Sequence, residues 1–238
     1  MIATAQSLRE QVASACRILA LEGYADLTLG HVSARVPESS TIYIKRKGVA
    51  LDEVEPDDVI SFDLHDADAL SSPEMHIEVV LHTEAYRARP DVGSVVHGHP
   101  PYATALAASQ AKLELLTHDS ILFVDGVPIF EDTVDLIVDA EQGRAVARAL
   151  GDHTAVLLRN HGVLAVGKDV PWAVLAAATL ERSVRLQTIA TTLGPLQPID
   201  PAVAGAVYPA KYHDRLVEEY WQAWLRRLRR NDDELARA

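Results

Sequence analysis

Apolar residues recur with helical spacing in several stretches of the chain. Within residues 5–23, the side chains of Val12, Cys16 and Leu19 are spaced three or four residues apart. This spacing places them on one face of a helix, and Gly23 supplies a stop. Similar patterns predict further helices over residues 77–88, 102–109, 142–150, 171–192 and 208–231.

Short apolar runs bounded by turn residues predict strands. Four of these runs cover residues 42–44, 59–62, 155–158 and 163–166. A further buried strand is predicted from the run Val-Gly-Ser-Val-Val-His-Gly-His-Pro-Pro at residues 92–101, which the two prolines end. Helices at both ends of the chain with short strands between them favour one α/β domain over residues 1–238, in which helices cover a central sheet.

The composition is that of an ordinary globular protein, with 48% hydrophobic residues among 238. No apolar run reaches the roughly 18 residues expected of a membrane span, and the N-terminus lacks the pattern of a signal peptide. The formal net charge of -12 argues against nucleic acid as a partner, and the single cysteine, Cys16, cannot form an internal disulfide. We therefore expect a cytoplasmic protein that acts on neither membranes nor nucleic acid.

His97 and His99 are the most informative pair in the sequence. They lie at the end of the buried strand predicted over residues 92–101. Side chains at positions i and i+2 of an extended segment point to the same side, so both imidazoles can reach one point. Two imidazoles aimed at one point are a metal-chelating arrangement.

His161 and Glu78 extend this pair to four residues. His161 lies in a turn between two predicted strands. Alone it would be a turn histidine bonded to backbone, but beside His97 and His99 we interpret it as a third ligand. Glu78 is predicted in the first turn of the helix over residues 77–88, where the helix dipole stabilises a carboxylate. Three neutral imidazoles and a carboxylate suit zinc, manganese or iron(II), and the sequence leaves that choice open.

Several motifs follow one another along the chain. They are Gly30-His31-Val-Ser33-Ala-Arg35, Lys47-Gly48, Glu78-x3-His82-x3-Tyr86-Arg-Ala-Arg-Pro-Asp-Val, His97-Gly-His99-Pro and Leu158-Arg-Asn-His161-Gly. Taken together and in this order, they resemble the class II aldolase/adducin family over roughly residues 7–230. The set is highly specific for the family but not for a reaction, because adducin-type members lack the chemistry.

The resemblance implies a three-layer α/β/α fold with a central, mostly antiparallel sheet, assembled as a homotetramer with active sites between subunits. It also implies one divalent metal ion per subunit, held by His97, His99 and His161. Glu78 would be the catalytic carboxylate, and would also bind the metal when substrate is absent. The C-terminal helix, at about residues 208–231, is expected to contact a neighbouring subunit. Non-catalytic members lose the four site residues, whereas this chain keeps them, so we interpret it as an enzyme, a lyase.

The chain departs from the family's sugar-phosphate enzymes where those enzymes hold phosphate. In place of small polar residues it carries four basic side chains, at His31, Arg46, Lys47 and His76. Arginine forms a fork to a planar carboxylate, and histidine can bind or protonate it. We therefore predict that these side chains bind a small anionic substrate. In this respect the chain resembles metal-dependent decarboxylases of hydroxylated aromatic or pyridine dicarboxylates, which favours a carboxy-lyase over an aldehyde-lyase.

Other functions stay open at this point. An aldolase or epimerase acting on a sugar phosphate or a hydroxy-keto acid would use the same metal site. A non-catalytic adducin-like interaction module would bind no metal, and an iron-dependent oxygenase would require oxygen. For proton transfer, Glu78 is the first candidate. His118 is the second, because it lies where the family's sugar-phosphate aldolases place a catalytic tyrosine.

Overall fold

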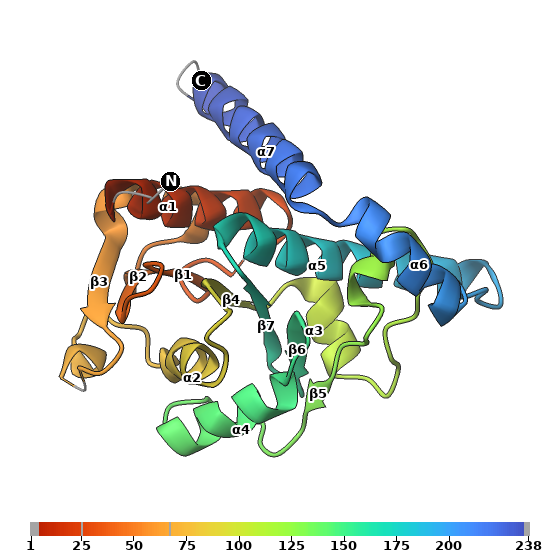
Figure 1. Cartoon of the computed structure of the whole chain (residues 1–238), viewed down its shortest axis with the longest axis horizontal. Coiled ribbons are helices and arrows are strands. Elements are labelled where there is room, and N and C mark those ends of the chain that lie inside the picture. Colours follow the sequence, from red (N-terminus) through yellow and green to blue (C-terminus); the bar gives the residue numbers. More distant parts are fainter. Residues whose placement is uncertain (1–4, 25, 67, 236–238) are drawn as a thin grey trace.

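Within the residues that the structure describes, which are 5–24, 26–66 and 68–235, seven strands form one sheet in the order β3-β2-β1-β4-β7-β6-β5 (Figure 1). The structure is a computed structural model. Neighbouring strands are antiparallel, except β5 and β6, which are parallel. The strands are β1 (His31–Arg35), β2 (Thr41–Lys45), β3 (Val59–Asp63), β4 (Ser94–Gly98), β5 (Ile129–Phe130), β6 (Ala155–Leu158) and β7 (Gly162–Gly167).

Helices cover both faces of the sheet (Figure 1). One face carries α1 (Ala5–Leu21), α3 (Pro101–Ala107) and α5 (Val170–Leu193), and the other carries α2 (Val80–Ala88) and α4 (Ala140–Leu150). Short 3-10 helices lie in the connections, at Leu51–Glu53, Pro56–Asp58, Ala69–Ser71 and Ser120–Phe123. This arrangement confirms the predicted three-layer α/β/α fold with a mostly antiparallel sheet. In the described part of the chain, none of the helices has the length and apolar character that crossing a membrane requires.

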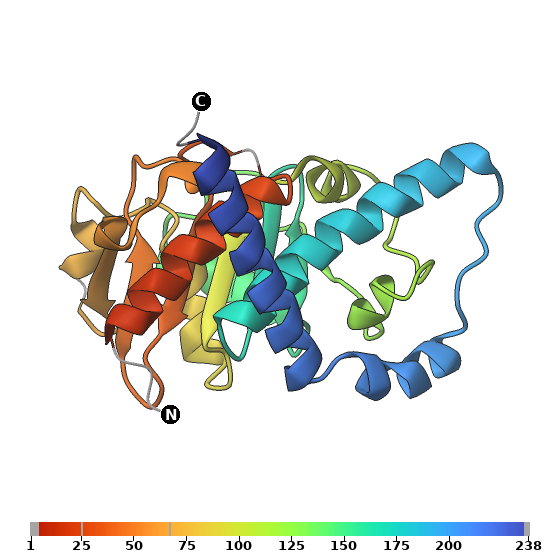
Figure 2. The same ribbon diagram turned by 90° about the horizontal axis from the view of Figure 1, so that it is seen from above.

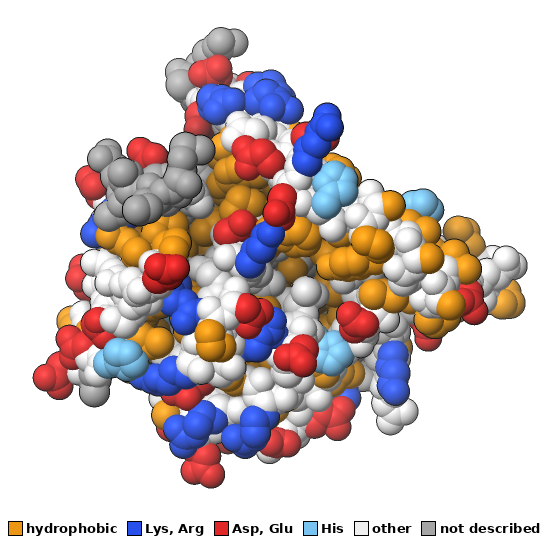
Figure 3. Space-filling model, viewed as in Figure 1, with side chains coloured by type: hydrophobic (Ala, Val, Ile, Leu, Met, Phe, Trp, Pro, Cys, Tyr) orange, Lys and Arg blue, Asp and Glu red, His pale blue; other side chains and the backbone are white. Residues whose placement is uncertain are grey.

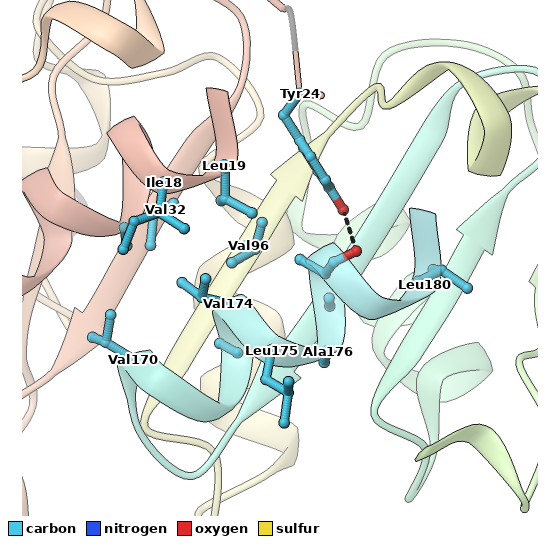
Figure 4. Close-up of a cluster of buried hydrophobic side chains, with 14 of the residues drawn as sticks. Ile18, Leu19, Tyr24, Val32, Val96, Val170, Val174, Leu175, Ala176 and Leu180 are labelled. Atoms are coloured by element: carbon cyan, nitrogen blue, oxygen red, sulfur yellow. Dashed lines mark hydrogen bonds between the residues drawn. The ribbon is translucent and has the colours of Figure 1, made fainter. Parts of the chain in front are cut away.

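Two hydrophobic cores form because successive strand residues point to opposite faces of the sheet. In β4, Val96 packs with the side chains of α1 and α5, among them the fully buried Ile18 (Figure 4). The preceding Val95 packs on the other face, among side chains of α2 and α4. Beside the first core, the hydroxyl of Tyr24 donates a 3.0 Å hydrogen bond to the carbonyl of Ala177 in α5 (Figure 4).

Strand β1 was not predicted, although it lies in the middle of the sheet. Val32 and Ala34 point to the α1 face, whereas His31 and Ser33 contact α2 on the other face. Because these polar residues are buried, β1 lacks the apolar run that identified most of the other strands. The antiparallel register places His31 directly opposite His97 of β4.

The C-terminal region contains two helices where the pattern predicted one over residues 208–231. These are α6 (Pro201–Lys211) and α7 (Asp214–Leu235), and α7 lies against α1 and α5 (Figure 2). The single-helix prediction was wrong because the chain turns at Tyr212, whose hydroxyl donates to the carbonyl of Asp119 at 2.9 Å. His213 then caps the start of α7 by accepting from the amide of Leu216 at 3.3 Å.

Candidate metal centre

Four side chains meet at one end of the central strands, where β4 ends and β7 begins. One ligand atom from each of Glu78, His97, His99 and His161 lies within 4.8 Å of the others. The ring centroids of the three histidines are 4.9, 5.1 and 5.2 Å apart. The structure therefore brings together the four residues that sequence reasoning placed at the metal site.

Glycines at two positions allow this convergence. A Cβ on Gly98 would lie 2.7 Å from a carboxylate oxygen of Asp26 and 2.8 Å from the ring of Tyr24. A Cβ on Gly162 would lie 2.6 Å from the carbonyl oxygen of Gly98 and 2.7 Å from the ring of His99. A larger residue at Gly98 would displace Asp26 and Tyr24, and one at Gly162 would push the ends of β4 and β7 apart and move His99.

The turn between β6 and β7 supplies the third histidine. Asn160 has a φ of 56°, in the left-handed region that asparagine adopts more readily than most residues. This conformation lets residues 159–161 connect Leu158 to Gly162, which are paired across the two strands. The local sequence thus holds His161 at the strand end, next to the cluster.

Hydrogen bonding determines which nitrogen of His97 faces the cluster. Its Nδ1 lies 2.9 Å from the carbonyl oxygen of Val163, and a carbonyl only accepts, so Nδ1 carries the hydrogen. Nε2 is then a bare nitrogen, 3.6 Å from the Glu78 carboxylate. Among the described residues, Nε2 of His97 and Nε2 of His161 are buried without a hydrogen-bond partner. Buried nitrogens without a partner are costly, and a divalent cation would satisfy both, so this donor set fits a metal ion.

Asp26 orients His99 from outside the cluster. One carboxylate oxygen accepts the backbone N–H of His99 at 2.7 Å, and the other lies 3.4 Å from its Nδ1. A carboxylate behind a metal-ligating histidine fixes the ring and raises its basicity. Burial raises the pKa of Asp26, but hydrogen bonds from His99 outweigh burial and leave that pKa below its usual value. Sequence reasoning missed Asp26, because nothing in its local sequence marks it as a partner of a distant histidine.

Glu78 lies before α2, and the prediction that it occupies the first helical turn was wrong, because the helix begins at Val80. Its Oε1 accepts the backbone N–H of Ile137 at 2.9 Å and lies 3.5 Å from Nε2 of His161. Burial raises the pKa of Glu78, but the contacts with His161 and His97 outweigh burial, so the net shift is downward. The N–H of Ile137, which donates to this carboxylate, also favours its ionised form.

A second group of basic side chains, which we call the basic wall, consists of His31, His76 and Lys45. The ring of His31 is 4.2 Å from that of His76 and 5.1 Å from that of His97. Nζ of Lys45, a fully buried lysine, lies 3.5 Å from Nε2 of His76 and donates to the carbonyl of Thr28 at 3.1 Å. Burial and the positive charge of Lys45 lower the pKa of His76 to about 3. The wall thus combines neutral imidazole with a buried ammonium group.

Arg46 and Lys47, the two predicted substrate-binding cations next to Lys45, have different surroundings from that lysine. Arg46 forms a 2.8 Å ion pair with Asp58, and the side chain of Lys47 is exposed. The cation that faces His76 is Lys45. Sequence reasoning did not single out Lys45, because three consecutive cations give no sign of which one points inward. Roles of Arg46 and Lys47 in substrate binding stay predictions.

His118 lies in an exposed turn ahead of the 3-10 helix Ser120–Phe123. Its backbone carbonyl accepts a 3.3 Å hydrogen bond from the hydroxyl of Tyr212, at the junction of α6 and α7. It is not a member of the four-residue cluster. Its part in proton transfer therefore stays a prediction.

Comparisons with known proteins agree with the fold. Residues 10–188 match the family model described as Class II Aldolase and Adducin N-terminal domain. The chain is 31% identical over 203 residues to the Meiotically up-regulated gene 14 protein of Schizosaccharomyces pombe. This alignment covers 82% of this chain and 79% of that protein. It is 34% identical over 201 residues to a 3,4-dihydroxyphthalate decarboxylase of Arthrobacter keyseri. This second alignment covers 78% of this chain and 79% of that protein.

Among solved structures, an aldolase II superfamily protein from Pseudomonas syringae superposes with a TM-score of 0.82. The two chains are 26% identical, and the match covers 95% of this chain and 93% of the other. Since the family model spans most of the chain and relatives of similar length align over most of theirs, this protein belongs to the class II aldolase/adducin family.

Proposed function

We propose that this protein is a metal-dependent lyase that decarboxylates a hydroxylated aromatic or heteroaromatic carboxylate or dicarboxylate. The observation that carries the proposal is the basic wall, which lies beside a complete four-residue metal cluster. Similarity to a 3,4-dihydroxyphthalate decarboxylase supports a carboxy-lyase among the reactions of the family.

The basic wall suits a planar anion. The imidazoles of His31 and His76 offer flat surfaces and ring nitrogens, and Lys45 offers a buried positive charge. In this proposal Arg46 and Lys47 stay the expected cationic contacts, and Lys45, which is fully buried, supplies positive charge behind His76. A carboxylate on an aromatic ring could contact the imidazoles and be attracted by the positive charge of the ammonium group behind them.

Each bond change in the reaction can be assigned. A divalent ion held by His97, His99 and His161 would supply Lewis acidity toward the oxygens of the substrate. Glu78, which is ionised, accepts the proton of the substrate hydroxyl. The bond from ring to carboxylate then breaks, carbon dioxide leaves, and the electron pair stays on the ring carbon. Glu78 returns its proton to that carbon, and the product phenolate takes one proton from solvent.

The proposal extends to assembly as a homotetramer. Large apolar side chains are exposed along α5 and α6, and hydrophobic surface gathers over this region (Figure 3). They are Leu186, Ile189, Leu193 and Val203. Exposed apolar patches of this kind are typical of protein interfaces. His118 is exposed and lies outside the cluster, so if it replaced Glu78 as the residue that returns the proton, it would act at the site of a neighbouring copy. Light scattering should give four times the mass of one chain, and a monomer would contradict this part.

A substrate panel tests the proposed reaction. Metal-loaded protein is incubated with hydroxylated benzene and pyridine dicarboxylates, including 3,4-dihydroxyphthalate, and carbon dioxide is measured. We expect release by the wild type and none by the matched variant His97→Ala. Cleavage of a ketose phosphate without carbon dioxide release would indicate an aldolase. Strict dependence on oxygen would indicate an oxygenase, and a protein that binds no metal would be a non-catalytic module; each of these results overturns the proposal.

A further inference from the structure

A chain of buried hydrogen bonds runs from the basic wall into the α2 face of the sheet. Nδ1 of His31 lies 2.7 Å from Nε2 of His82. Nδ1 of His82 lies 2.6 Å from Oγ of Ser33, and that oxygen lies 2.7 Å from the hydroxyl oxygen of Tyr86. All four side chains are at most 2% exposed, so bulk water does not compete for these groups.

The direction of these bonds follows from Tyr86. Its hydroxyl is buried, and among the described residues the side-chain oxygen within reach is Oγ of Ser33. The tyrosine hydrogen therefore points to Ser33, because a buried O–H without an acceptor costs free energy. The hydrogen of Ser33 then points to Nδ1 of His82. His82 carries its own hydrogen on Nε2 and donates it to Nδ1 of His31.

His31 is left with its one ring hydrogen on Nε2, at the edge of the ring that faces away from His82. The adjacent His97 has the opposite tautomer, since its Nδ1 donates to the carbonyl of Val163 and its Nε2 is bare. The two ring centroids are 5.1 Å apart. A bare nitrogen can bind a cation, whereas an N–H can only donate a hydrogen bond. Hydrogen bonding thus makes His97 a metal ligand and His31 a hydrogen-bond donor, although the two rings are neighbours.

We propose that His82, Ser33 and Tyr86 are positioning residues that hold His31 as a fixed hydrogen-bond donor to an anionic oxygen of the substrate. They also keep the Nε2 nitrogen of His31 from binding the metal ion. The substrate class, a planar hydroxy-carboxylate, rests on the proposed function, but the tautomer does not. His31 binds the substrate and does not protonate it. A proton supplied to His31 through Ser33 and His82 would come from Tyr86 and leave a charged phenolate at this buried residue.

Neutron diffraction tests the tautomer without any turnover. Crystals of the zinc-loaded protein, exchanged into heavy water, should show deuterium on Nε2 of His31, on Nε2 of His82 and on Nδ1 of His97. Deuterium on Nδ1 of His31, with a bare Nε2, would overturn the proposal. This result does not depend on whether the protein is a decarboxylase, so it separates failure of the inference from failure of the proposed function.

Two variants at one position test the donor role. His82→Leu removes the donor to His31, whereas His82→Gln keeps an amide N–H there. Since a hydrogen bond to a charged group contributes about 1.5–3 kcal/mol, we expect KM for the substrate to rise about 10- to 100-fold in His82→Leu. The zinc content should not change, and His82→Gln should stay close to the wild type. Tyr43→Phe, which removes a hydroxyl on the α1 face, is the matched control and should leave KM unchanged.

Equal KM values in His82→Leu and His82→Gln, or loss of zinc from both, would overturn the donor role. If His82→Leu fails to fold, Ser33→Ala replaces it, because it removes the donor to Nδ1 of His82. If no substrate turns over, calorimetric binding of phthalate to the same variants replaces KM, with the same expected ratio. Absence of phthalate binding to the wild type would overturn the donor role together with the proposed function, and neutron diffraction would still decide the tautomer.

Discussion

The two faces of the sheet are built differently, although the same strands line both. On the α1 face, Val32, Val96 and Val163 are fully buried among other apolar side chains. On the α2 face, near the same strand ends, β1 and β4 present His31 and His97. Hydrophobic burial holds the first face together and needs no particular partner atoms. The second face has a hydrophobic core of its own, but each buried polar atom at these strand ends also needs a partner.

A ligand fits where buried polar atoms lack a partner within the protein. On the α2 face, His82, Ser33 and Tyr86 satisfy one another. Among the described residues, the cluster nitrogens left buried without a partner are Nε2 of His97 and Nε2 of His161. Substitutions on the α1 face should therefore change stability, and substitutions near the cluster should change metal binding or turnover.

The largest expected effect separates chemistry from metal binding. Glu78→Gln removes the carboxylate that accepts and returns the proton, so kcat should fall by about 10²- to 10⁴-fold. Much of the metal should stay bound, because the three histidines are unchanged. His97→Ala should lose the metal. Metal analysis by mass spectrometry and kcat on the same preparations check both. Equal metal loss in the two variants would show that Glu78 is chiefly a ligand.

On the α1 face, Leu19→Ala should destabilise the fold and spare the site. Leu19 is 1% exposed in the apolar core, so its truncation should lower the free energy of unfolding by about 2–5 kcal/mol. Denaturant unfolding measures this change, and metal analysis of the folded variant should match the wild type. Metal loss as large as that of His97→Ala would show that the two faces do not act separately.

Asp26→Asn should weaken metal binding without abolishing it. The substitution removes the charge behind His99, and changes to such outer partners typically cost about 10- to 100-fold in metal affinity. Competition with a chromophoric chelator measures the metal Kd. Asp57→Asn, at an exposed carboxylate, is the matched control. An unchanged Kd in Asp26→Asn would remove Asp26 from the account of the site.

The smallest change in stability is expected at Asp119, which belongs to neither hydrophobic core of the sheet. Burial raises the pKa of Asp119, but contacts with Lys211 and Arg182 outweigh burial and lower it. A carboxylate whose pKa is lower in the folded state stabilises the fold at any pH above its unfolded-state pKa. This stabilisation is lost as the pH falls through the folded-state pKa. Asp119→Asn should therefore cost less than about 1 kcal/mol near neutral pH, because partly exposed ion pairs contribute little. Denaturant unfolding at neutral and acid pH should show the difference shrink toward acid, and a difference that grows there would contradict this assignment.

Residues close in sequence could be interpreted from the sequence, as could His161 and Glu78, whose residue types suit the same metal site. Other residues that pair across the fold could not. The spacing of His97 and His99 places two imidazoles at one strand end, and the structure confirms that they meet. Asp26 contacts His99 from a segment far away in sequence, and no local pattern records that contact. The choice of Lys45 among three consecutive cations likewise depends on how β2 ends against its neighbours.

The chain of His82, Ser33 and Tyr86 was within partial reach of sequence reasoning. His82 and Tyr86 are four residues apart, so they share one helix face. Their partner Ser33 comes from β1, the strand that apolar patterning missed because polar side chains are buried on one of its faces. Buried polar networks defeat such patterning, because their residues satisfy one another only after the fold has formed.

Decarboxylation in heavy water follows the proposed bond changes themselves. Metal-loaded wild-type protein is incubated in D2O with the substrate panel, and carbon dioxide and the aromatic product are measured together. We expect one carbon dioxide for each product molecule and one deuterium on the ring carbon that carried the carboxylate. Intact dicarboxylates across the panel, with cleavage of a ketose phosphate by the same preparation, would contradict this expectation.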